Sequence, residues 1–407
     1  MAYEILTVEK LPEFLYGIES IKSYFEGAEL DIEEVGDGNL NFVYIVTSKE
    51  NPARTLVVKQ AVPYLRIAGE GFPLSRERMT FEIRALQSNE KLAGEYTPKI
   101  YYADEAMSIV IMQNLNEHII LRKGLIQKIR YNHFAEHIST YLAQTLFHTS
   151  SLSLTSTEKR QQMDRLNANT ELCKLTEDFV FTFPFMENET NAVDPLCEVE
   201  AEELFTDMAF KKQLLKLKYT FMNQSDALLH GDFHTGSIMA NEDETFVIDP
   251  EFAFVGPFGF DIGALVANIL NAYISHVHVS KDETYQQWLL KTTKSMIEQF
   301  EVKFLALWKQ QKESALITEG FIDDTHLDGY REEFMQMIFS QTVGFAGAKM
   351  ARRVFGIAGV EEIRGIEDDA IRKAAMLSAL RIGKMLVMEH ETISNMDELI
   401  RKVEAIA

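Results

Sequence analysis

Apolar residues form short runs typical of strands in the first part of the chain and recur at helical spacing in the second part. This change of pattern divides the chain into two regions. Residues 11–27 repeat apolar side chains at helical spacing, and short apolar runs after them predict strands. The predicted strands cover residues 30–35, 42–47, 54–61, 99–103 and 108–112, with a helix over residues 75–87. The first part of the chain is therefore expected to be rich in β-structure.

Helical spacing of apolar residues dominates after Leu115. The predicted helices include residues 134–145, 201–224, 264–276, 284–312 and 330–355. Residues 181–195 are expected to form a loop because of their Pro and Asn content. The pattern predicts an α+β protein, with a β-rich part over residues 1–115 and a mainly helical part over residues 116–407.

Two short apolar runs on either side of a polar turn predict a β-hairpin within the helical part. The runs are residues 238–240 and 245–248. A hairpin brings its ends together, so the loop that carries Asp232 is expected to lie near Asp249 and Glu251. Three carboxylates at one place repel one another unless a cation lies between them, and carboxylates alone favour Mg²⁺. The sequence thus predicts a magnesium site at this hairpin.

Other candidate side chains fit more than one interpretation on their own. Lys59 ends an apolar strand, where a lysine is commonly a surface residue whose stem packs on the strand. Arg352 and Arg353 precede Gly356 at a predicted helix end, where cations complement the helix dipole. The glycine-containing turn over residues 36–41 fits an ordinary hairpin as well as a loop that approaches phosphates. These residues alone leave both interpretations open in each case.

The charge balance narrows the classes of partner. The chain has 407 residues and a net charge of −22 at pH 7, which argues against nucleic acid or an anionic membrane surface as a general partner. Cys173 and Cys197 form neither a metal-binding spacing nor a disulfide framework. No secretory signal and no apolar run of about 18 residues is visible, so a cytoplasmic location without membrane insertion is expected.

Three strings around the hairpin resemble one known family. HGDFHTGSI at residues 230–238, VIDPEFAF at residues 247–254 and GFDIG at residues 259–263 together are similar to the methylthioribose kinases. These enzymes are related to the aminoglycoside phosphotransferases and choline kinases. The resemblance implies a two-lobed protein-kinase-like fold, with residues 1–115 as the nucleotide-binding lobe. It also implies ATP-dependent, Mg²⁺-assisted phosphorylation of the 1-hydroxyl of 5-methylthioribose in methionine salvage, and a homodimer.

The resemblance assigns roles to the residues at matching positions. Asp232 is the expected catalytic residue, and Asp261 is expected to anchor its loop. Lys59 is expected to hold the ATP phosphates, as the strand lysine of such kinases does, and Glu82 to orient it. The segment Asp249, Pro250 and Glu251 is expected to contact ATP, with the two carboxylates as magnesium ligands.

The remaining expected contacts lie outside the hairpin. ATP is expected to contact Asn39 in the glycine turn and the hinge residues Gln113, Asn114 and Leu115. The sugar is expected to contact Asp232 together with Arg352 and Arg353, which match the twin-arginine segment of the family. Ser237 stands where many members of the wider family carry a second metal-binding Asn, and the methylthioribose kinases share this serine.

Three other functions remain open from the sequence. The alternation of His230, Asp232 and His234 would suit a metal hydrolase if the segment were a strand, although the glycines around it favour a loop. A non-catalytic binding module of the same fold fits less well, because the expected catalytic and nucleotide-binding residues are retained. An aminoglycoside or choline kinase would suit an acidic pocket, whereas Arg352 and Arg353 favour a neutral sugar.

Overall fold

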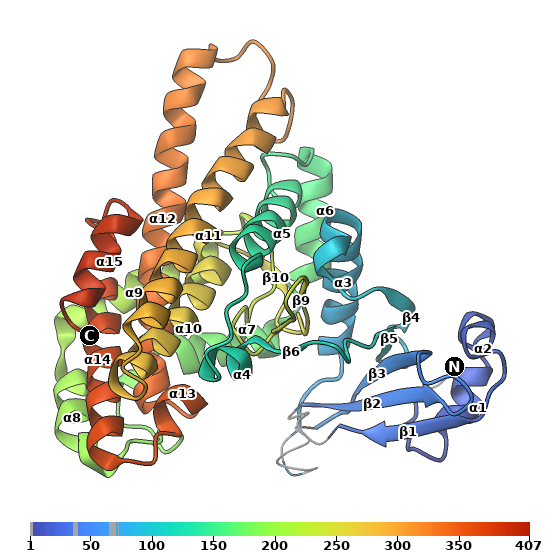
Figure 1. Cartoon of the computed structure of the whole chain (residues 1–407). Helices are drawn as coiled ribbons and strands as arrows, with labels where there is room; N and C mark the ends of the chain where they lie inside the picture. The colour runs from blue at the N-terminus through green and yellow to red at the C-terminus, as the bar shows by residue number, and fades with distance from the viewer. Residues whose placement is uncertain (1–2, 36–39, 65–70, 72) are drawn as a thin grey trace.

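The computed structural model describes residues 3–35, 40–64, 71 and 73–407. A β-sheet with two short helices against it lies at one end of the molecule, and a larger body of helices forms the rest (Figure 1). The chain passes from the sheet into the helical body and stays there to its last residue. The structure therefore confirms the predicted α+β fold with a β-rich N-terminal part and a helical C-terminal part.

The N-terminal sheet has five antiparallel strands in the order β1, β2, β3, β5, β4. Their bounds are β1 (Leu30–Glu34), β2 (Asn41–Ser48), β3 (Thr55–Ala61), β4 (Ile100–Asp104) and β5 (Ile109–Gln113). Each end differs from its prediction by at most one residue, so these five strands are confirmed. Lys59 lies on the central strand β3, opposite Val43 of β2 and Val110 of β5.

The single helix predicted over residues 11–27 is wrong. The structure has two helices, α1 (Leu11–Tyr16) and α2 (Glu19–Phe25), because Ile18 adopts an extended conformation with φ −100° and ψ 110°. The bend lets both helices pack their apolar residues on one face of the sheet, against Tyr44 and Ile111 among others. The sequence pattern continues through the bend, so the helical period alone did not reveal it.

Helix α3 (Arg78–Ala93) covers the opposite face of the sheet. Its Met79, Ile83 and Leu86 pack against Ala61 and Val110 of the sheet. Since side chains alternate along a strand, Lys59 points to the same face as Ala61. The strand lysine and the helix glutamate Glu82 are thereby brought face to face.

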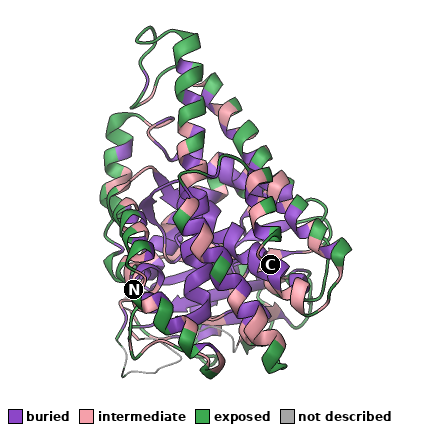
Figure 2. Ribbon diagram, turned by 90° about the vertical axis from the view of Figure 1, so that its left-hand side faces the viewer, coloured by how far each residue is buried: buried purple, intermediate pink, exposed green. Residues whose placement is uncertain are grey.

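The helical body is organised around α10 (Gly259–His278), which is buried along most of its length. α10 packs against α11 (Glu283–Gln310) and α12 (Asp324–Phe355), and α12 packs in turn against α14 (Asp369–Glu389). Figure 2 shows this buried interior, with many of the exposed residues on the outer helices and in the loops. The other helices are α4 (Leu121–Ile126), α5 (Phe134–His148), α6 (Ser156–Leu166), α7 (Thr170–Phe181), α8 (Glu198–Thr206), α9 (Met208–Asn223), α13 (Glu361–Arg364) and α15 (Met396–Glu404).

The helix predicted over residues 201–224 is also divided. α8 ends before Asp207, and α9 begins after it. The Asp207 carboxylate accepts a hydrogen bond from the backbone N–H of Phe210 at 2.9 Å, which is the typical cap of a helix N-terminus. Within the described ranges, no helix combines the length and the apolar character that a membrane crossing needs.

The predicted hairpin is confirmed. β8 (Ile238–Ala240) and β9 (Thr245–Val247) pair antiparallel with Ile238 opposite Val247, and β6 (Ile119–Ile120) adds to β8. A second pair joins β7 (Ala227–Leu229) to β10 (Phe254–Gly256). The chain therefore leaves one strand pair just before His230 and re-enters it at Phe254, so these two pairs hold the Asp232 loop and the Asp249 segment between them.

Glycines allow α10 and α12 to touch along their backbones. A Cβ atom on Gly263 would lie 2.5 Å from the carbonyl oxygen of Thr342 and 2.9 Å from the nitrogen of Ala346. A Cβ atom on Gly259 would lie 2.6 Å from the nitrogen of Thr342. This close contact fixes the last turns of α12 relative to Asp261, which lies between the two glycines on α10.

Candidate active site

The loop over residues 230–237 has a tightly determined conformation. Gly231 has φ 83°, and a Cβ atom there would lie 2.1 Å from the carbonyl oxygen of Phe252. The backbone N–H groups of His230 and Gly231 donate to the Asp261 carboxylate at 2.6 and 3.1 Å. The Ser237 hydroxyl donates to the carbonyl oxygen of Asp232 at 2.9 Å. Asp261 therefore anchors this loop, as predicted.

The Asp232 carboxylate lies between a lysine and a histidine. Lys349 of α12 is 2% exposed, and its Nζ lies 3.3 Å from Oδ1 of Asp232. Nε2 of His234 lies 3.3 Å from Oδ2 of the same carboxylate. The Lys349 ammonium also lies 4.6 Å from the centre of the Phe260 ring, within range of a cation–π contact.

These neighbours keep Asp232 ionised. Burial alone would raise the pKa of Asp232, but His234, Lys349 and Arg352 hold it well below its ordinary value. Burial lowers the pKa of His234 to about 4, so its ring is neutral at pH 7. The charges that stabilise the carboxylate at neutral pH are therefore those of Lys349 and Arg352. Burial, opposed by Asp232, lowers the pKa of Lys349 to about 8.

Lys59 joins two carboxylates from different parts of the chain. Its Nζ donates to Oε1 of Glu82 on α3 at 2.8 Å and to Oδ1 of Asp249 after β9. Burial alone would lower the pKa of Lys59, but the charges of Asp249, Glu82 and Glu251 raise it above its ordinary value. The predicted pairing of Lys59 with Glu82 is thus present.

A second network holds Glu251. Its Oε2 accepts a hydrogen bond from Nδ2 of Asn41 at 2.9 Å, and Nε of Arg78 lies 3.8 Å from the same oxygen. Arg78 in turn donates to Oδ1 of Asn41 at 3.1 Å and to the carbonyl oxygen of Val62 at 3.0 Å. The buried guanidinium therefore ties Glu251 to the sheet.

The predicted group of three carboxylates needs a correction. Within the described residues, the group with donor atoms within 4.8 Å of one another is Glu82, Asp249 and Glu251, and Asp232 is not a member. A hairpin brings its two ends near each other, but this nearness does not bring the Asp232 carboxylate within 4.8 Å of the other carboxylates. Asp249 has a left-handed backbone with φ 66°, so the segment that carries Asp249 and Glu251 is not extended.

This acidic group fits a divalent cation. All three side chains offer carboxylate oxygens, the ligands that Mg²⁺ prefers. Oε2 of Glu82 is buried and accepts no hydrogen bond from the described part of the chain, so one ligand oxygen is available. Burial and the charge of Asp249 raise the pKa of Glu251 above its ordinary value, whereas Lys59 and Arg78 lower it.

The residues predicted to form the hinge lie at the end of β5. Oε1 of Gln113 accepts from the N–H of Lys99 at 3.3 Å, and Nδ2 of Asn114 donates to Oγ1 of Thr55 at 3.0 Å. Leu115 is 5% exposed. Pro250 is buried beside Glu251. Asn39 lies outside the described residues, so its predicted contact has no structural counterpart here.

Arg352 and Arg353 end α12 on the side of Asp232. Each is 7% exposed, and the Nε atoms of both make no hydrogen bond within the described ranges. Nη1 of Arg353 donates to the carbonyl oxygen of Ala358 at 2.9 Å. Burial lowers the pKa of both guanidinium groups against the attraction of Asp232. Such buried cations with free donors suit an oxygen-rich ligand better than a role at the helix end alone.

The phosphotransferase enzyme family matches residues 31–289 of this chain. Methylthioribose kinase 1 of Oryza sativa subsp. japonica is 40% identical over 92% of this chain and 89% of its own length. The methylthioribose kinase of Escherichia coli O45:K1 (strain S88 / ExPEC) is 36% identical over 99% of this chain and 98% of its own.

The chain belongs to the methylthioribose kinase family. Its similarity extends to the Geobacillus sp. (strain WCH70) enzyme, which is 39% identical over 92% of this chain and 90% of that enzyme. Among solved structures, a choline kinase from Cryptosporidium parvum Iowa II matches with a TM-score of 0.46 and 12% identity, over 98% of this chain and 96% of that one. The family resemblance inferred from the three strings is confirmed by the sequence relatives.

Sequence reasoning missed two buried cations of this family member. Lys349 lies within the apolar second half of α12, three residues before Arg352, which places both on one helix face. Arg78 lies four residues before Glu82 on α3 and is also buried. A charged residue inside an apolar helical run was the available signal, but the partners of Lys349 and Arg78 lie far away in the chain.

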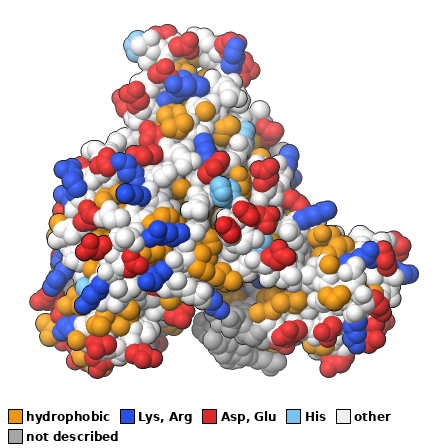
Figure 3. Space-filling model, viewed as in Figure 1, with side chains coloured by type: hydrophobic (Ala, Val, Ile, Leu, Met, Phe, Trp, Pro, Cys, Tyr) orange, Lys and Arg blue, Asp and Glu red, His pale blue; other side chains and the backbone are white. Residues whose placement is uncertain are grey.

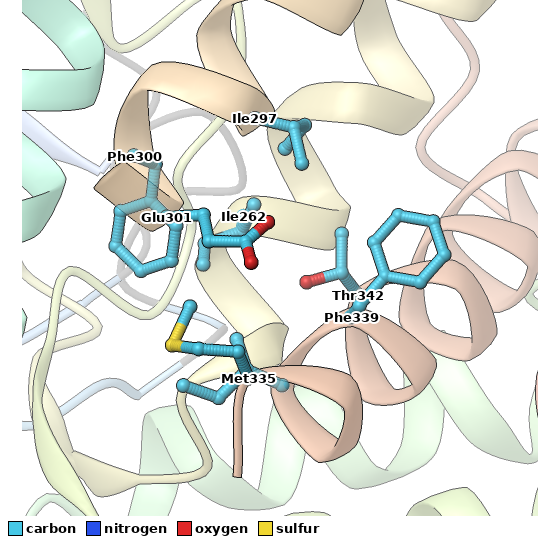
Figure 4. Close-up of a pocket in the computed structure, with 8 residues that line it drawn as sticks. Ile262, Ile297, Phe300, Glu301, Met335, Phe339 and Thr342 are labelled. Carbon is cyan, nitrogen blue, oxygen red and sulfur yellow. The ribbon is translucent and has the colours of Figure 1, made fainter. Parts of the chain in front are cut away.

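The apolar cavity between α10, α11 and α12 is not a second site for substrate. Figure 4 shows side chains from these helices around it, including Ile262, Phe300 and Met335. Its volume of about 20 Å³ admits little more than one water molecule. On the face seen in Figure 3, acidic and basic side chains are mixed, so this face carries no large patch of acidic side chains alone.

Proposed function

We propose that this protein transfers the γ-phosphate of ATP to the 1-hydroxyl of 5-methylthioribose, giving the 1-phosphate in methionine salvage. The observation that carries the proposal is Asp232, held ionised by Lys349 and Arg352 on the helix that ends in the twin arginines. The family relatives named above support the choice of acceptor.

On the acceptor side, Asp232 receives the hydrogen of the reacting hydroxyl. Because its pKa is held well below the ordinary value, Asp232 orients the hydroxyl more than it removes the proton early in the reaction. The free Nε donors of Arg352 and Arg353 would bind sugar oxygens or the transferred phosphate. Arg353 is partly committed to Ala358, so Arg352 has more of its donors available.

On the nucleotide side, Lys59 would hold the phosphates once it leaves Asp249, while Glu82 keeps it oriented. Asp249 and Glu251 would hold Mg²⁺, which neutralises the charge that develops on the phosphates. Pro250 and the hinge residues Gln113, Asn114 and Leu115 complete the proposed ATP contacts, together with Asn39.

We further propose the lobe boundary near Leu115, with residues 1–115 binding nucleotide and residues 116–407 binding the sugar. A homodimer and a cytoplasmic location are proposed from the family resemblance. Sedimentation of the purified chain tests the dimer, and a mass equal to one chain at micromolar concentration would contradict it.

The test of function is an ATP-consumption assay with purified protein over methylthioribose, choline, aminoglycosides and simple sugars. We expect Mg²⁺-dependent turnover with methylthioribose, and product analysis should show the 1-phosphate. Asp232→Asn is the matched control for contaminating kinases. Turnover of choline or an aminoglycoside with methylthioribose inert would show that the acceptor is assigned wrongly.

A further inference from the structure

Glu362 is a buried carboxylate that lacks hydrogen-bond donors. It lies on α13 and is 4% exposed, and neither of its oxygens accepts a hydrogen bond of normal geometry from the residues the structure describes. The nearest cation is Arg122 of α4, whose Nε lies 3.6 Å from Oε2 of Glu362 and is itself unpaired within the same ranges. Buried polar groups are nearly always satisfied in folded proteins, so this pair calls for a partner.

The pair adjoins the proposed sugar site. The backbone N–H of Arg122 donates to the carbonyl oxygen of Thr235, in the Asp232 loop, at 3.0 Å. A Cβ atom on Gly236 would lie 3.4 Å from Nη1 of Arg122 and 2.6 Å from Cε1 of His234. The loop therefore separates Arg122 from the Asp232 carboxylate by no more than the His234 ring and a glycine.

Arg353 links the two carboxylates electrostatically. Its charge interacts with Asp232 and with Glu362, and burial raises the pKa of Glu362 against the charges of Arg122 and Arg353. An anion would be repelled by Glu362, and an ammonium ion would be repelled by Arg122 and Arg353. A neutral group that both donates and accepts hydrogen bonds satisfies the acid and the guanidinium together. Neighbouring hydroxyl groups of a sugar have this chemistry.

We propose that Glu362 and Arg122 form a subsite for hydroxyl groups of the acceptor sugar other than the one that is phosphorylated. Glu362 accepts hydrogen bonds from these hydroxyls, and Arg122 donates one back. This subsite rests on the proposed function. It adds Glu362 and Arg122 as the residues that distinguish a sugar with several hydroxyl groups from an acceptor with fewer. The position of the negative charge also keeps the transferred phosphate on the side of Lys349 and the twin arginines.

The test compares methylthioribose with its 2-deoxy and 3-deoxy analogues on the wild type and on Glu362→Ala. For the wild type, at least one deoxy analogue should lose about 10²-fold or more in kcat/KM, since a site built to bind a hydroxyl rejects its absence. Glu362→Ala should lose a similar factor with methylthioribose, yet change less than about threefold with that deoxy analogue. KM for ATP should stay within about twofold, as the nucleotide site does not include Glu362.

Two further variants keep the test decisive. Glu362→Gln preserves the shape of the side chain, so it carries the same comparison if the alanine variant does not fold. Glu361→Gln changes an exposed neighbour on the same helix and should leave kcat/KM unchanged. Equal losses on all three sugars, or a wild type indifferent to both hydroxyls, would overturn the subsite. If the wild type phosphorylates a different polyol, the proposed function fails and the deoxy series of that polyol tests the subsite.

Discussion

Two clusters of charged side chains lie at this site, one with more carboxylates than cations and the other with more cations than carboxylates. On the proposed nucleotide side, the carboxylates of Glu82, Asp249 and Glu251 face Lys59 and Arg78. On the proposed acceptor side, the single carboxylate of Asp232 faces Lys349, Arg352 and Arg353, all three buried. One group lacks positive charge and the other lacks negative charge.

This difference matches what each side would have to bind. An acidic group with a free oxygen suits a cation, which in the proposed function would arrive with the nucleotide. A basic group with unpaired donors suits the oxygens of the sugar and of the phosphate that it receives. If the proposed roles hold, Asp249 and Glu251 would hold the cation that neutralises the phosphates of ATP, and Lys349, Arg352 and Arg353 would lie on the side that receives the phosphoryl group. The separation also explains why Asp232 is not a member of the acidic group.

Removing the carboxylate on the acceptor side should have the largest effect. Asp232→Asn keeps the shape of the side chain but loses the charge that orients the hydroxyl, and we expect kcat to fall by about 10²-fold or more. KM for ATP should change little, because Asp232 lies apart from the acidic group. Steady-state kinetics measures both, and turnover within about threefold of the wild type would remove Asp232 from the chemistry.

Removing charge on the nucleotide side should act through the metal. Asp249→Asn is the cleaner probe because its side chain is 47% exposed, whereas Glu251 is buried against Asn41 and Arg78. We expect the Mg²⁺ concentration for half-maximal activity to rise by about tenfold, with KM for the sugar unchanged. Glu251→Gln should show the same rise and a lower Tm as well.

A matched acidic control sharpens this metal titration. Glu242 is exposed in the turn of the same hairpin, and Glu242→Gln should leave the Mg²⁺ curve in place. Unchanged curves in both Asp249→Asn and Glu251→Gln would show that the ion binds elsewhere.

The parts of the fold that follow from local sequence were predictable. A polar turn between two apolar runs predicts the hairpin at residues 238–247. Short apolar runs likewise predict the five strands of the sheet. The breaks at Ile18 and Asp207 were missed, since apolar residues keep a helical period across each break while the packing of the flanking helices requires a change of direction.

The parts of the site that depend on distant contacts were not predictable from residue types. Lys349 meets Asp232 across 117 positions of the chain, and Asn41 meets Glu251 across 210. An isolated lysine in a helix gives no sign of which carboxylate it will contact. The roles given to Asp249 and Glu251 by family resemblance remain predictions. Their closeness to Glu82 depends on the packing of α3 on the sheet, which the sequence does not show.

The smallest effect is expected at Lys349, which contacts the Asp232 carboxylate. Lys349→Met removes a charge that stabilises the carboxylate, and we expect kcat to fall by about tenfold with KM for ATP unchanged. Lys349→Arg keeps the charge and should recover most of the loss. Lys303, whose Nζ is bound by Ser139 and Thr140 away from the site, gives a matched control in Lys303→Met.

The pH dependence of kcat distinguishes a positioning role of Lys349 from a purely structural one. The ammonium faces Asp232 from the loop, Asp261 from α10, and Arg352 and Arg353 from its own helix. Burial lowers the pKa of Lys349 to about 8, so the charge is present below that pH and is lost above it, while Asp232 stays ionised throughout. Wild-type kcat should therefore decline as the pH rises through about 8, and Lys349→Arg should move the decline to higher pH. A decline that stays at the same pH in the arginine variant would assign it to another group and reduce Lys349 to a packing residue.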